Sequence, residues 1–179
     1  MIGRIVRGAA MGAAAGAAGI TALYVVTYTD MAIRGRSPSG APASEIERLA
    51  EKADIAMPGD EDTRQNRLTA AGALAGIGVG VAIGAAYGVA RASGLRLPVL
   101  AGAAATGLAA MAAANAPMMA LGVSDPRTWS AADWASDAIP HAAYGAVTAA
   151  CAAALTDGSH PARTASAGDS AGTRSARSA

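Results

Sequence analysis

Four stretches of the chain contain no Asp, Glu, Lys or Arg, and they alternate with polar segments. They cover residues 8–29, 68–90, 97–123 and 138–156, so each is 19 to 27 residues long. A helix needs roughly 20 apolar residues to cross the hydrocarbon core of a bilayer. Because a helix also satisfies its backbone hydrogen bonds within one segment, each stretch is predicted to be a transmembrane helix. The predicted fold is all-α, a four-helix transmembrane bundle within residues 1–156.

Two alternatives bear on this interpretation. The first stretch is also compatible with a secretory signal, because Arg4 and Arg7 precede it. Its most hydrophobic part, residues 20–26, follows the small residues 13–18 instead of preceding them, which favours a retained span. A soluble all-helical protein is the other alternative, but helices in water should show a polar stripe, and these four stretches show none.

The polar segments have their own pattern. In the connection 34–67, Ser44 and Glu47 fit a capping box before apolar residues at helical spacing, so a short amphipathic helix is predicted over 44–55. Its mixed charges are typical of a solvated spacer helix. The tail 157–179 is rich in Ser, Ala, Thr, Gly and Arg without periodic apolar residues, and it is predicted to be disordered.

Glycines recur every fourth residue in the first two stretches. A four-residue step drifts slowly around a helix, so such glycines form a groove along which another backbone can approach closely. The pattern predicts that the first two spans pack by these glycine ladders, against each other or against copies of themselves. A glycine zipper that builds a homo-oligomer or pore is the functional alternative to ordinary packing inside one bundle. The ladder residues are Gly8, Gly12, Gly16, Gly72, Gly76, Gly80, Gly84 and Gly88.

Composition narrows the possible functions. Hydrophobic residues make up 53% and charged residues 15%, and the net charge of +1 gives no field that would recruit nucleic acid. The single cysteine, Cys151, excludes an intramolecular disulfide. The only histidine besides His141 is His160 in the tail, and no hydrolase motif is present, so no enzymatic activity, cofactor, metal or small-molecule ligand is predicted. The expected partner is the lipid bilayer.

The best candidate site lies at one membrane face. Four antiparallel spans bring the end of the first, the start of the second, the end of the third and the start of the fourth to that face. On a helix, side chains four residues apart share a stripe, and Trp129 and Trp134 mark the headgroup level just before it. The candidate polar or ion-site residues are Asp30, Asp133, Asp137, His141 and Tyr144.

Two interpretations of this stripe remain open. An Asp–His pair inside a span can relay a proton, handle another ion or hold a metal ion, because ionisable residues in a membrane are usually functional. Alternatively, the last helix begins at Ile139 with Pro140 in its first turn and Asp137 as its cap. The first interpretation predicts a small proton or cation transporter or channel; the second predicts a structural or accessory membrane protein.

The basic residues near the span ends are evenly divided between the two faces. Arg4, Arg7, Arg91 and Arg96 have few acidic neighbours, which favours a cytoplasmic N-terminus.

The segment 117–145, PMMALGVSDPRTWSAADWASDAIPHAAYG, resembles the terminal region of YagU-like bacterial inner-membrane proteins. That family pairs an apolar span ending in Pro and Gly with a W-x-x-D/E-x-x-x-H segment. The matching positions are Pro117, Gly122, Trp134, Asp137 and His141. The resemblance covers about a sixth of the chain. It implies a multi-pass protein of a bacterial inner membrane with an uncharacterised role.

Overall fold

The computed structural model describes residues 1–157, and the regular structure of that part of the chain is helical. Four helices are long and apolar enough to cross a membrane: α1 (Ile2–Arg34), α3 (Glu61–Ala92), α4 (Val99–Ala120) and α5 (Ala131–Asp157). Helix α2 (Ala41–Lys52) and the 3-10 turn η1 (Pro126–Thr128) lie in connections. The predicted all-α bundle with four membrane helices is confirmed. Beyond Asp157, the predicted disordered tail lies outside the described residues.

Two helices continue well past the charge-free stretches that predicted them. Helix α1 has 33 residues and α3 has 32. At 1.5 Å per residue each is about 50 Å long, whereas the hydrocarbon core is about 30 Å thick. The additional turns carry the charged residues that the prediction excluded, because charge is tolerated outside the hydrocarbon core. Helix α1 ends at Arg34 and is followed by Gly35, whose φ of 62° is the left-handed conformation that glycine adopts without steric cost.

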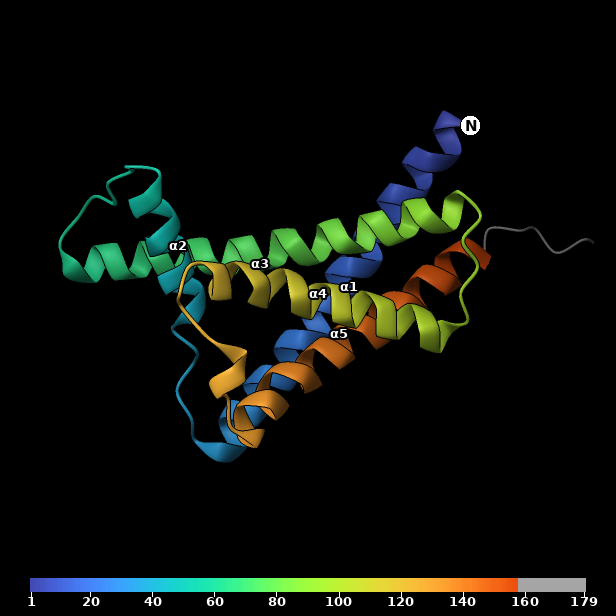
Figure 1. Ribbon diagram of the computed structural model, residues 1–179. Helices are drawn as coiled ribbons and strands as arrows, with labels where there is room; N and C mark the ends of the chain where they lie inside the picture. The colour runs from blue at the N-terminus through green and yellow to red at the C-terminus, as the bar shows by residue number, and fades with distance from the viewer. Residues whose placement is uncertain (158–179) are drawn as a thin grey trace, which may run out of the picture.

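Helix α2 begins one turn earlier than predicted. Gly40 precedes its first residue, Pro42 occupies the first turn, and the helix ends at Lys52, three residues before the predicted end. The predicted capping box of Ser44 and Glu47 is wrong, because the Glu47 carboxylate forms an ion pair with Arg64 of α3 instead. Figure 1 shows α2 running across the N-terminal part of α3.

The long helices pack in the order α3, α1, α5, α4. Helix α1 contacts both α3 and α5, and α5 also contacts α4. In the view of Figure 1, α3 and α4 run in similar directions across the picture, while α1 and α5 cross them diagonally. Helices α3 and α4 follow each other along the chain but touch much less; one contact between them is Tyr87, whose hydroxyl lies against Gly102.

Glycines hold α1 and α3 at backbone contact. A Cβ added at Gly84 would lie 2.6 Å from the Cα atom of Gly16, and one added at Gly88 would lie 2.8 Å from the Cα atom of Gly12. Real Cβ atoms essentially never come that close to another heavy atom. The antiparallel helices therefore touch through their main chains, and packing of this kind drives association where lipid supplies no hydrophobic effect between helices.

Only part of the glycine ladder in α3 contacts α1. Gly72 lies against the backbone of Pro42 in α2, and a Cβ added at Gly76 would meet nothing within 4 Å. Within one chain Gly76 therefore packs against no other helix, and its place in contacts between copies stays a prediction. A four-residue step turns by about 40° around an α-helix, so a ladder that faces α1 at Gly84 has turned away from it two steps earlier.

A second close approach joins α4 to α5. A Cβ added at Gly145 would lie 2.8 Å from the backbone nitrogen of Gly107. On another face of α5, the ring of Tyr144 is fully buried beside Gly19 of α1, and its hydroxyl donates a 2.7 Å hydrogen bond to the carbonyl of Gly80 in α3. Helix α5 is therefore fixed on three sides, which positions the polar residues of its N-terminal half.

The glycine contact predicts opposite effects for one substitution at two rungs of the ladder. We expect Gly84→Ala to lower the free energy of unfolding by about 1–3 kcal/mol, because the new methyl group meets the α1 backbone. The matched control, Gly76→Ala, should be neutral or stabilising by up to about 1 kcal/mol, because alanine favours helix and the position is open. Denaturant unfolding in micelles, followed by circular dichroism, measures both. Equal effects at the two sites would contradict the packing described.

The start of α3 predicts an acid-dependent loss of stability. The Asp60 carboxylate accepts a 2.9 Å hydrogen bond from the backbone nitrogen of Thr63, and hydrogen bonding to Thr63 lowers the pKa of Asp60. A lowered pKa in the folded state stabilises the protein above the unfolded-state pKa, and this contribution disappears as the pH falls through the folded-state value. We expect the melting temperature of the native chain to fall over that window more than that of Asp60→Asn. Parallel pH profiles of the two chains would show that Asp60 does not act as this cap.

Candidate functional site

The N-terminus of α5 is capped by Ser130, not by Asp137, which was the candidate cap in the sequence. The hydroxyl of Ser130 accepts a 3.2 Å hydrogen bond from the backbone nitrogen of Asp133, and the Asp133 carboxylate accepts one of 2.9 Å from the backbone nitrogen of Ser130. This reciprocal pair is a capping box. The alternative start at Ile139 with Asp137 as cap is wrong, because α5 begins at Ala131 and continues through Pro140.

Inside the helix, Asp137 meets a polar residue of α4. The Nδ2 atom of Asn115 donates a 2.8 Å hydrogen bond to Oδ2 of Asp137. The His141 ring lies one turn further along α5, with its Nδ1 atom 3.5 Å from Oδ1 of Asp137. The side chains of His141 and Asp137 are 13% and 20% exposed, so both are shielded by the α4–α5 contact. Three polar groups thus meet at the contact of two apolar helices.

The geometry also fixes the tautomer of His141. Its Nδ1 atom lies 2.7 Å from the backbone carbonyl oxygen of Asp137. A carbonyl oxygen can only accept, so Nδ1 must carry the hydrogen. In the neutral imidazole, Nε2 is then the nitrogen with the free lone pair.

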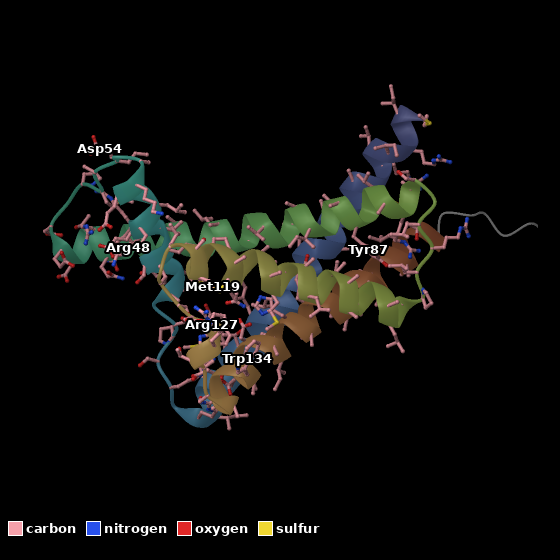
Figure 2. The ribbon with its side chains drawn as sticks, viewed as in Figure 1. Arg48, Asp54, Tyr87, Met119, Arg127 and Trp134 are labelled. Atoms are coloured by element: carbon pink, nitrogen blue, oxygen red, sulfur yellow. The ribbon has the colours of Figure 1, made fainter. Side chains whose placement is uncertain are left out.

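Tryptophans mark the end of the bundle at which this cluster lies. The rings of Trp129 and Trp134 meet edge to face with centroids 5.2 Å apart, and Trp129 donates to the hydroxyl of Ser124. Figure 2 shows Trp134, Arg127 and Met119 at this end and Tyr87 toward the other. Trp and Tyr side chains favour the headgroup region. His141 follows Trp134 by seven residues, about 10 Å along the helix, which places it below that region.

The other residues named from the sequence have separate partners. Asp30 pairs with Arg36 at 2.5 Å and with Arg34 at 3.4 Å. Arg34 also donates a 2.9 Å hydrogen bond to Ser136, which ties the end of α1 to α5 beside Asp137. Tyr144 bonds to α3, as described above, and Asp133 belongs to the capping box. The structure therefore brings Asp137 and His141 together and places Asp30, Asp133 and Tyr144 in other interactions.

Asn115 was missing from the residues assigned to the site by sequence. A signal existed, because Asn115 stands alone as an amide side chain in the apolar stretch 97–123. Polar side chains in membrane helices commonly bond across helix contacts. Its partner was not deducible, since the pairing depends on how α4 is rotated against α5.

Comparisons with known proteins add no family assignment: no family model, curated protein or solved structure matches this chain. The YagU-like resemblance therefore stays a prediction.

The Asn115–Asp137 bond predicts a measurable coupling between two helices. We expect a double-mutant cycle of Asn115→Leu and Asp137→Leu to give a coupling free energy of about 1–2 kcal/mol. The carboxyl acceptor strengthens the hydrogen bond, but the unfolded chain in the membrane also finds polar partners, which reduces the net contribution. Unfolding in micelles supplies the four free energies. The same cycle with Asn66→Leu, at an exposed position of α3, should be additive. Additivity in both cycles would contradict the bond.

Proposed function

We propose that this chain is a multi-pass membrane protein that handles protons or cations at Asp137 and His141 without enzymatic catalysis. One observation carries the proposal: a carboxylate and an imidazole share a shielded position inside the bundle, and Asn115 of a second helix bonds to the carboxylate. Ionisable groups are costly inside a membrane and mark ion or proton routes where they occur. A purely structural contact between α4 and α5 needs no ionisable group, because Gly107 and Gly145 already bring the backbones together.

The membrane and orientation belong to the same proposal. The YagU-like segment supports a bacterial inner membrane. A cytoplasmic N-terminus is supported by Arg4, Arg7, Arg91 and Arg96, which lie close to the span ends of one face and have few acidic neighbours. Basic residues close to span ends favour the cytoplasmic side.

A structural or accessory role is the second candidate. It is favoured by the extent of glycine contact, since α1 with α3 and α4 with α5 both meet at their backbones. We propose that the α1 and α3 glycines act as a glycine zipper within one chain. A homo-oligomer would then need another face, such as that of Gly76, which is open. In either role the partner is the lipid bilayer, with no nucleic acid or small-molecule ligand.

A flux assay separates the two candidates. The full chain is reconstituted in liposomes that contain a pH-sensitive dye, and a membrane potential drives ions inward. We expect faster internal acidification than in empty liposomes, with at least a tenfold loss of the excess rate in Asp137→Asn. The matched control is Asp62→Asn, at an exposed position of α3 outside the charge-free stretch, which should behave like the native chain. If neither protons nor Na⁺ and K⁺ move faster than in empty liposomes, the structural role is favoured instead.

A further inference from the structure

We infer that the site takes a proton and not a metal or alkali cation, that the proton binds at Nε2 of His141, and that Asn115 is the positioning residue for the Asp137 counter-charge. This inference rests on the proposed function and names the species that the site handles.

The groups around the Asp137 carboxylate argue for a proton. Hard cations need several oxygen ligands around them. Here Oδ2 of Asp137 faces the NH₂ group of Asn115 at 2.8 Å, and Oδ1 faces the protonated Nδ1 of His141 at 3.5 Å. The opposite orientation of the Asn115 amide would set its carbonyl oxygen against an ionised carboxylate oxygen, which is repulsive. Oδ2 of Asp137 therefore meets a hydrogen-bond donor, and the described residues place no group of three or more His, Cys, Asp or Glu side chains around Oδ1 that could ligate a metal ion.

The imidazole supplies the position for the proton. Nδ1 is engaged with the carbonyl of Asp137, so the lone pair that remains is on Nε2. A proton from water at one face adds to this lone pair and gives the imidazolium, and it leaves from the same nitrogen to water at the other face. The only bond formed and broken is N–H, and no oxidant or reductant takes part. The imidazolium then stands beside the Asp137 carboxylate, so the loaded pair has no net charge inside the membrane.

The charged groups nearest to Asp137 and His141 are engaged with partners of their own. Arg34 approaches α5 but is shared between Asp30 and the Ser136 hydroxyl. Asp133, one turn before Asp137, accepts hydrogen bonds from Ser130. From α4 the polar group that reaches Asp137 is the neutral Asn115. Asn115 thus fixes the position of the counter-charge without adding charge of its own.

The first test is the tautomer of His141, which does not depend on transport. The full chain with His160→Gln, labelled with ¹⁵N-histidine and placed in lipid nanodiscs, contains one labelled residue. At a pH at which the ring is neutral, we expect the hydrogen on Nδ1 and a bare Nε2. Asn115→Ala and Asp137→Asn should leave the tautomer unchanged, because the bond is to a backbone oxygen. A hydrogen on Nε2 in the native chain would overturn the inference whatever the flux.

The second test is ion selectivity in the liposome assay. We expect proton flux without Na⁺ or K⁺ flux, and at least a tenfold loss in His141→Gln. Asn115→Ala should reduce proton flux severalfold, Asn115→Gln should recover part of it, and the control Asn66→Ala should have no effect. Na⁺ or K⁺ flux that depends on Asp137 would overturn this inference but leave the proposed function standing. Full flux in Asn115→Ala would overturn the role of Asn115, whereas absence of all flux would overturn the proposed function itself.

Discussion

The contact of bare backbones between helices is the interaction on which the rest of this bundle depends. Helices surrounded by lipid gain nothing from the hydrophobic effect when they associate. The free energy of association must therefore come from close packing and interhelical hydrogen bonds. In this chain Gly12 and Gly16 meet Gly84 and Gly88, while Gly107 meets Gly145. Among the described residues the largest fully buried side chain is Tyr144, which fits because Gly19 and Gly80 leave room for its ring. Gly19 and Gly80 therefore help to fix α5 against α1 and α3.

The position of α5 determines the chemistry of the candidate site. One face of this helix packs on α1 and α3 through Tyr144, and another packs on α4 through Gly145. Asp137 and His141 lie on turns before these contacts, where the Asn115 side chain of α4 is within hydrogen-bond distance. A polar bond in a poorly solvated place is strengthened by its surroundings and costly if it is broken. The packing of glycines and the polar cluster are therefore parts of one arrangement.

The sequence was a good guide to elements and a weaker guide to partners. It predicted the four apolar helices because the absence of charge over about 20 residues is itself the physical requirement for a span. It misplaced the start of α2, since Glu47 fits a capping box as well as it fits an ion pair with Arg64. It also left open whether Asp137 caps α5, because Pro140 is compatible with a first turn. Ser130 and Asp133 settle that question through a capping box two turns earlier.

By itself, then, the sequence determined that the chain is helical, that four segments suit a membrane, and that Asp137 and His141 share a stripe. Only the tertiary structure decided that Gly76 faces outward, that Asp30 belongs to Arg34 and Arg36, and that Asn115 holds Asp137. The physical reason is that hydropathy and helical spacing are local properties of one segment. The rotation of one helix against another depends on packing between segments. Because successive residues are about 100° apart around a helix, a modest rotation changes which side chain faces the neighbouring helix.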